Sequence, residues 1–448
     1  MGKNNKKKNR DTQNLCLLSY LPSTICYLLL TLLSTNTFAA EQMSNNSPTN
    51  NPYVTEVTDY KKPLELPELR LGPVNFYPRL GFQSMYDDNI NTSTRNEQSD
   101  FIWTVLPGIF TVAGDKDYAI STRIAGRTVG PPRTSIITDS KYWPGITAYV
   151  DYGARVNQYT SHTDQNYTDH IVNGYFFIPF TKSLLEFSQG YSQINTEILE
   201  AGERSPQIIY NTALKYGIQL SGKTSLESKF SRISTDYENR KDFSSYVDYS
   251  IQNWLNWQYS QKLNLSAGVI AGMYDIEKQP NQTYEQFRAR ARYYIFERLW
   301  IDGSVGMQLR QFDTDRSSTT EPVFTLSASY SPRDRTVISL SASRQEYASV
   351  YSGYNYLSTS IGANVYQQIG KRYTAIIGGG FSRYDYIATF TGKSLDRSDD
   401  YFYTGLSFKA RITKHLDGSF FYTYRQENYY NGATYANNQV GIQFMFNY

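Results

Sequence analysis

Apolar and polar residues alternate along most of the chain after residue 72. In the segment 210–220 the even positions carry mostly Tyr, Leu and Ile, and in 299–309 the odd positions carry Leu, Ile, Val and Met. Both segments run about eleven residues, which is the length a tilted strand needs to cross a bilayer, whereas strands of soluble proteins average about 5–6 residues. The pattern predicts transmembrane β-strands with one face toward lipid and the other toward a lumen.

Eighteen segments show this alternation, so we predict an all-β, transmembrane, antiparallel up-and-down β-barrel of about 18 strands, with 16 or 20 as alternatives. The segments are 76–86, 101–112, 146–157, 168–180, 184–196, 207–220, 225–236, 245–260, 263–275, 284–296, 299–312, 322–331, 335–347, 355–368, 373–386, 400–412, 416–428 and 437–448. Residues 117–143 leave the count open, because they form either an insertion or a further hairpin that would make 20 strands.

The connections between these segments alternate in length. Short turns, such as 181–183 and 370–372, alternate along the chain with longer loops, such as 197–206 and 387–399. Outer-membrane barrels have short periplasmic turns and longer external loops. We therefore expect the short turns on the periplasmic side and the longer loops outside the cell.

The first 39 residues resemble a secretory signal peptide. Basic residues between Lys3 and Arg10 precede a nine-residue apolar segment, 25–33, which is too short to span a bilayer. Small residues follow, and Ala39 is the expected cleavage point, with Ala40 as the alternative. We expect a signal peptide over 1–39, a flexible periplasmic segment rich in Asn, Pro, Thr and Glu over 40–71, and the barrel over 72–448.

Composition excludes several classes of function. The net charge is +3, but five positive charges lie before residue 11, so the mature chain is near neutral and nucleic acid is not an expected partner. Both cysteines fall within the signal peptide, and the three histidines are not placed beside a Ser for nucleophilic catalysis. We expect no enzyme activity, no catalytic residues, no metal and no cofactor.

The end of the sequence carries an aromatic pattern. Its face of apolar residues is interrupted by a polar residue and a glycine, and this arrangement is similar to the recognition signal of the barrel-assembly machinery. A strand with a free edge suits assembly by edge pairing. The residues of this predicted assembly signal are Gln439, Gly441, Phe444, Phe446 and Tyr448.

A family resemblance begins near the first strand. The run 76–82, Phe-Tyr-Pro-Arg-Leu-Gly-Phe, leads into Tyr-Asp-Asp-Asn-Ile at 86–90 and Leu-Pro-Gly at 106–108. Together with Asp169 and His170 before a later strand, these residues resemble the β-barrel porin 2 family. The resemblance implies an outer-membrane barrel and a role in exopolysaccharide export, which would involve a periplasmic export partner. Residues 117–143 depart from the family pattern.

The segment 284–296 carries three arginines at alternate positions. Arg288, Arg290 and Arg292 cannot face lipid, where each would cost about 2–4 kcal/mol, so they should form a ladder in the lumen about 14 Å long. Such a ladder could attract anions or bind an acidic polymer, or it could be neutralised by acids such as Asp302 and Glu227. The predicted lumen-lining residues are Arg288, Arg290, Arg292, Asp302, Gln308, Arg310, Glu227, Lys229, Trp254 and Tyr274.

These patterns predict a multi-pass β-barrel in the outer membrane of a Gram-negative bacterium, surrounded by outer-membrane lipid and inserted by the barrel-assembly machinery. The expected function is a channel, of the porin kind, for export or passage of polysaccharide or small solutes. The alternative is a non-conducting structural or receptor barrel with functional external loops. Conductance separates the two.

Overall fold

The computed structural model describes residues 69–125, 144–238, 242–277, 279–313, 318–390 and 397–447. The predicted signal peptide, most of the segment that follows it, and Tyr448 of the predicted assembly signal lie outside these residues. Within the described ranges no helix is both long and apolar enough to cross a membrane.

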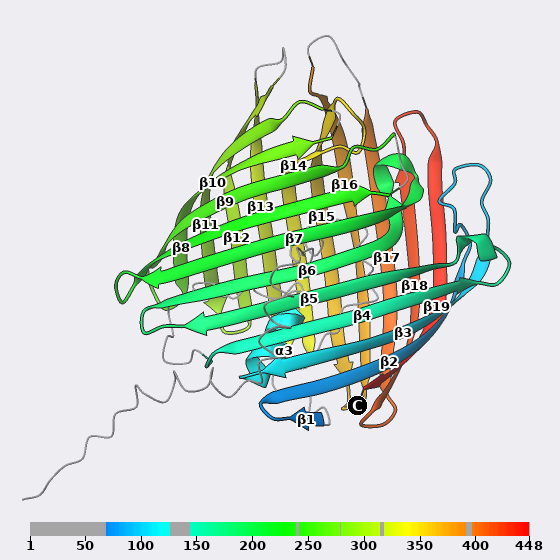
Figure 1. Ribbon diagram of the computed structural model, residues 1–448, viewed down its shortest axis with the longest axis horizontal. Helices are drawn as coiled ribbons and strands as arrows, with labels where there is room; N and C mark the ends of the chain where they lie inside the picture. The colour runs from blue at the N-terminus through cyan, green and yellow to red at the C-terminus, as the bar shows by residue number, and fades with distance from the viewer. Residues whose placement is uncertain are drawn as a thin grey trace, which may run out of the picture. The chain divides into compact units, whose positions relative to one another are not determined.

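The described residues form a single antiparallel sheet that closes on itself (Figure 1). The first short strand, β1 (Leu69–Leu71), pairs with β2, and the remaining 18 strands form a ring in which the last strand pairs with β2. The ring strands are β2 (Val74–Asp87), β3 (Asp100–Ala113), β4 (Thr147–Tyr159), β5 (Tyr167–Pro179), β6 (Ser183–Ile198), β7 (Glu203–Gln219), β8 (Thr224–Tyr237), β9 (Tyr246–Gln258), β10 (Leu263–Ile276), β11 (Gln282–Phe296), β12 (Leu299–Phe312), β13 (Ser318–Arg333), β14 (Thr336–Ala348), β15 (Tyr354–Ile369), β16 (Tyr373–Ala388), β17 (Ser398–Arg411), β18 (Leu416–Asn428) and β19 (Thr434–Asn447).

The outer face of the ring is apolar and exposed. Phe287 is 59 % exposed, Val305 64 % and Ile361 62 %, while alternate residues on the same strands are polar and more buried. Soluble monomers rarely expose apolar patches beyond a few hundred Å², whereas lipid solvates such a surface. A closed ring also gives each of its strands a hydrogen-bonded neighbour on both sides, as a membrane span requires. The protein is therefore a multi-pass β-barrel of the outer membrane, as the alternation predicted.

The ambiguous segment after β3 is an insertion and adds no strand to the ring. β3 pairs directly with β4 from Ile102 to Ala113, so the alternative of a further hairpin and 20 strands is wrong. The segment begins with an α-helix, α3 (Lys116–Ala125), and residues 126–143 lie outside the described part of the chain. The sequence left a further hairpin open here, but β3 and β4 already pair with each other and leave no place for another strand between them.

The connection predicted as a loop over 197–206 is largely strand. β6 runs to Ile198 and β7 starts at Glu203, with a 3₁₀ turn (Leu199–Ala201) between them, and the ladder pairs Glu197 with Arg204. Polar residues here suggested a loop because the lipid-facing pattern stops. The hairpin instead continues beyond the wall of the barrel, where no apolar face is needed.

Candidate functional site: the lumen and its external mouth

The ten residues predicted to line the lumen all lie on the strand face opposite the exposed apolar residues. They divide by exposure. Arg288, Arg290, Glu227 and Lys229 are partly exposed, and the other six are buried: Arg292, Asp302, Gln308, Arg310, Trp254 and Tyr274.

The arginine ladder on β11 is only partly neutralised. Arg292 forms an ion pair with Asp302, with 2.9 Å between Nη2 and Oδ2. Arg290 donates to Asn256 at 2.9 Å, and its guanidinium lies 4.4 Å from the centre of the Trp254 ring. Within the described part of the chain, neither Arg288 nor Arg290 has an acidic partner.

Glu227, the second acid that the sequence offered as a partner for the arginine ladder, lies on β8 and pairs with Lys215 instead. Its Oε1 atom is 3.8 Å from Nζ of Lys215, which also lies 3.8 Å from Oε2 of Glu186. All three side chains are 15–22 % exposed. The ladder therefore presents two uncompensated positive charges toward the lumen.

The end of the β14–β15 hairpin bends into the barrel and covers the buried residues Gln308 and Arg310. Leu340 and Ile361 face outward on this hairpin, and alternation places Glu346 and Asn355 on the same face. Yet Glu346 and Asn355 are buried against inward-facing residues of β11 and β12. The backbone pairing between β13 and β14 ends at Phe324 and Arg344. Beyond these residues, toward the β14–β15 turn, the two strands separate.

Polar side chains fill the contact between this hairpin and the wall. Nε of Arg310 lies 3.1 Å from Oε1 of Glu346, and Gln308 donates to the same carboxylate at 2.9 Å. Asn355 donates to Glu346 at 2.7 Å and to Gln282 at 2.9 Å. Gln308 and Arg310 therefore lie on the inward face of β12, where the hairpin covers them.

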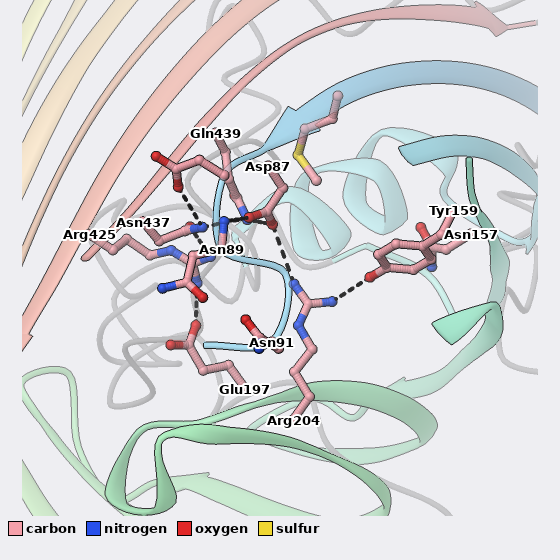
Figure 2. A network of polar contacts seen from close by, with 12 residues as sticks. Asp87, Asn89, Asn91, Asn157, Tyr159, Glu197, Arg204, Arg425, Asn437 and Gln439 are labelled. Carbon is pink, nitrogen blue, oxygen red and sulfur yellow. Dashed lines mark hydrogen bonds and ion pairs between the residues drawn. The ribbon is translucent and has the colours of Figure 1, made fainter. Parts of the chain in front are cut away.

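A second hairpin, β6–β7, crosses the mouth from another side of the ring. Glu197 pairs with Arg425 of β18, with 2.5 Å between Oε2 and Nη1. Arg204 lies 3.6 Å from the Asp87 carboxylate and donates to the Tyr159 hydroxyl at 2.9 Å. Figure 2 shows these contacts converging from β2, β4, β6, β7 and β18.

Asp87 is the central acceptor of this network. Its carboxylate accepts from Asn437 at 2.6 Å, from Gln439 at 2.7 Å and from the backbone N–H of Asn89 at 3.0 Å (Figure 2). The side chain is fully buried. These hydrogen bonds join β2 to β19, so the network holds the seam at which the ring closes.

The turns of the two hairpins meet over the lumen. We call residues 199–202 the β6–β7 tip and residues 349–353 the β14–β15 tip. Ile198, Phe243 and Val350 form a buried apolar cluster between them. Oε2 of Glu200 accepts a hydrogen bond from the backbone N–H of Val350 at 3.0 Å.

Glu200 and Arg397 are two charged residues of this junction outside the strands, and Asp242 of the β8–β9 connection acts on Tyr351 of the β14–β15 tip. Burial raises the pKa of Glu200 to about 7, although the N–H of Val350 and the charge of Arg397 lower it. Burial alone would lower the pKa of Arg397, but Tyr386 and Asp399 outweigh it and raise that pKa. Arg397 donates to the backbone carbonyl of Glu200 at 2.8 Å and pairs with Asp399 at 2.6 Å.

The helix α3 packs against the inner wall near the other end of β3 and β4. Arg123 donates to Asp151 at 2.7 Å, and Arg79 of β2 reaches the other oxygen of that carboxylate at 2.7 Å. Tyr118 and Tyr175 share a hydrogen bond at 3.0 Å. Inward-facing residues of β2–β5 are therefore covered by the helix.

The predicted assembly signal lies on the closing strand. Phe444 and Phe446 face outward and are 43 % and 46 % exposed. Gln439 faces inward and binds Asp87, and Gly441 sits where a Cβ would come within 2.5 Å of the Phe421 ring.

Sequence reasoning missed the residues of the mouth, namely Glu197, Glu200, Arg204, Glu346 and Arg425. One signal was present. Glu197 and Arg204 flank the turn symmetrically, so opposite charges face each other across a hairpin. The partners on β2, β14 and β18 carry no comparable signal, because they lie far away in the sequence.

No family model matches the sequence, and the search of curated proteins gives no match. Among solved structures, the chain is similar to OccAB4 of Acinetobacter baumannii, at 10% identity over 86% of this chain and 100% of that one, with a TM-score of 0.42. It is similar to OccK3 (OpdO) of Pseudomonas aeruginosa, at 10% identity over 83% and 95%, with a TM-score of 0.44. It is also similar to the FrpB iron transporter of Neisseria meningitidis, at 8% identity over 79% and 62%, with a TM-score of 0.45.

Proposed function

We propose that the protein is an outer-membrane channel for small solutes with a preference for anions. The observation that carries this proposal is the pair Arg288 and Arg290, which face the lumen, are partly exposed, and have no acidic partner within the described ranges. An unpaired charge buried in a dry interior is costly, so these side chains call for a hydrated lumen. Their field would concentrate anions, because confinement weakens screening.

The test is ion selectivity in planar bilayers, read from the reversal potential in a KCl gradient. Replacing both residues, Arg288→Gln and Arg290→Gln, removes two charges and keeps hydrogen-bonding groups. The anion-to-cation permeability ratio should fall by roughly twofold or more, and most at low salt. The matched control is Arg292→Gln with Asp302→Asn, which removes one cation and one anion together and should leave the ratio near that of the parent.

A non-conducting receptor barrel is the second candidate. The two hairpins that cover the mouth favour it, because they fill space that an open pore would need. The same recordings decide between the two. A parent protein that carries no current under any condition would favour the filled barrel and rule out the channel, whereas current with an unchanged ratio in the double variant would rule out only the anion preference.

Transport of a polysaccharide remains a narrower prediction, which rests on the resemblance to the β-barrel porin 2 family. A polymer could pass only if both hairpin tips moved aside, which would demand a periplasmic export partner or another source of free energy. Polymer accumulating in the periplasm of cells that lack the protein would support export. Normal polymer on the surface of such cells would argue against it.

A further inference from the structure

The two hairpin tips contact each other through an apolar cluster and the hydrogen bond from Val350 to Glu200. Each tip also bonds to neighbouring loops, the β14–β15 tip through the N–H groups of Ser244 and Thr389 and the β6–β7 tip through Thr92 and Arg397. The tips come from opposite parts of the ring, since β6 and β7 lie far from β14 and β15 in the strand order. Between them, Ile198 is 7 % exposed, Val350 5 % and Phe243 of the β8–β9 connection 1 %. A contact of this size, at the end of two projecting hairpins, can separate without disturbing the wall.

Glu200 sits in this junction with one carboxylate oxygen satisfied. Oε2 accepts from the backbone N–H of Val350, and Oε1 is buried with no hydrogen bond of good geometry among the described residues. The side chains of Ser349 and Tyr386 lie close enough to lower the pKa of the carboxyl, but burial outweighs them. Arg397 does not bind this carboxylate. It donates to the backbone carbonyl of Glu200 and directs its charge to Asp399. A carboxyl placed in this way is costly to ionise while the tips stay in contact.

Every element packed against Glu200 contributes groups to its environment. The β16–β17 connection contributes the cation Arg397, and the β14–β15 tip contributes Ser349 and Val350. Asp399 pairs with Arg397, and the acids Glu203, Asp242 and Glu427 act on the tyrosines that line the junction. The other titratable groups around Glu200 are tyrosines, which stay neutral across the physiological range. They are Tyr237 of β8, Tyr246 of β9, Tyr351, Tyr356 of β15, and Tyr384 and Tyr386 of β16.

We propose that the tip junction is a pH-sensitive gate of the channel and that Glu200 is its switch. The protonated carboxyl stays seated between the tips and keeps the mouth covered. The ionised carboxyl leaves its seat for water, and the two tips part. The movement is confined to the turns, because the ion pairs of Glu197 with Arg425 and of Arg204 with Asp87 hold the stem of the β6–β7 hairpin. This inference rests on the proposed channel function.

The direction of the pH effect follows from linkage. Seated Glu200 has a pKa raised by burial to about 7, against the ordinary value of 4.5 when it is in water. The closed junction therefore binds the proton more tightly than the open one, so closure is favoured at acidic pH and is lost as pH rises through about 7. Between pH 5.5 and pH 8 the open-to-closed ratio should rise by more than about tenfold.

The first experiment records single-channel open probability in planar bilayers at pH 5.5, 7 and 8. The parent should open with rising pH. Glu200→Gln keeps the shape of the side chain without its charge, so this variant should stay closed at pH 8. The matched control is Glu97→Gln in the exposed β2–β3 loop, which should behave as the parent does.

The second experiment fixes the tips with a disulfide between Ile198→Cys and Val350→Cys, in a mature chain without other cysteines. Oxidised protein should stay closed at every pH, and reduction should restore opening. The proposed gate is wrong if the open probability of the parent does not depend on pH, or if the oxidised pair opens at pH 8, and the proposed channel function is then unaffected. If neither the parent nor the reduced pair carries current at any pH, the proposed channel function is wrong, and so is the gate that rests on it.

Discussion

The ion pair between Arg310 and Glu346 joins two strands that are not neighbours in the ring. Arg310 lies on β12 and Glu346 on β14, with β13 between them, and both side chains are almost fully buried. They can meet only because the β14–β15 hairpin leaves the wall and bends over the inner face of β11 and β12. The pair therefore reports on the docking of that hairpin.

Removing one partner of this pair should release the hairpin. Glu346→Ala leaves a buried guanidinium uncompensated, which costs about 3 kcal/mol of docking free energy, or roughly a hundredfold in local opening. Amide hydrogen exchange of the β14–β15 tip should accelerate accordingly, while the wall strands stay protected. The double variant Arg310→Met with Glu346→Leu should lose much less docking free energy, because it leaves no buried charge without a partner. Equal exchange in Glu346→Ala and the parent would show that the pair does not hold the hairpin.

Glycine at position 268 should be required for packing beneath the arginine ladder. A Cβ added to Gly268 would lie 2.4 Å from the Trp254 ring, which is the residue opposite it on β9. Gly268→Ala must displace Trp254 and, with it, Arg290, so we expect a loss of about 1–3 kcal/mol in the free energy of unfolding. Urea unfolding in lipid vesicles measures this loss. Gly222→Ala is the control, because a Cβ there meets nothing within 4 Å, and equal losses in both variants would contradict the packing argument.

The strands of the wall could be predicted because lipid enforces an apolar residue at every second position. The predicted segments 299–312 and 416–428 have the bounds that the structure gives to β12 and β18. The prediction that the three arginines of β11 face the lumen rests on the same constraint. A charge facing lipid costs free energy at each position, so the sequence repeats the signal along every strand.

The mouth could not be predicted in the same way. Leu340 and Glu346 have the same parity on β14, and alternation places both on the outer face. Leu340 does face outward, but Glu346 is buried inside because the hairpin bends. Alternation indicates which residues share a face of a strand, but it does not indicate whether that face contacts lipid, water or another strand. The contacts of Glu346 with Gln308 and Arg310 depend on a bend that no local pattern records.

The orientation of the barrel predicts which turns reach the cell surface. The turn between β18 and β19 contains Gly432, where a Cβ meets nothing within 4 Å, and lies at the end of the longer loops. An epitope inserted after Gly432 should be labelled on intact cells. The control, an epitope after Gly370 in the short β15–β16 turn, should be labelled only in permeabilised cells. Reversed labelling would invert the assignment of both ends.

An epitope at Gly202 would be a poor probe of the same question. Gly202 has a φ of +62°, and a Cβ there would lie 2.6 Å from the Tyr429 hydroxyl. Its carbonyl also accepts from Thr92 at 2.8 Å. An insertion would disrupt the β6–β7 tip, so the labelling result would reflect a change in the gate as well as the side of the membrane on which residue 202 lies.

The outward aromatic face of β19 should be needed for assembly. Phe444 pairs with Phe82 and Phe446 with Leu80 across the seam that closes the ring, and both aromatic rings face lipid. Replacing both with Gln keeps the backbone ladder but removes the apolar contact on which recognition and insertion of this strand would depend. The variant should accumulate unfolded in the periplasm, without the heat-modifiable band of a folded barrel. Deleting residues 446–448 should have the same effect. Met445→Gln is the matched control on the same strand, because residue 445 faces inward beside Gly81. Normal surface levels of the double Phe variant, or an equal defect in Met445→Gln, would mean that this face does not act as an assembly signal.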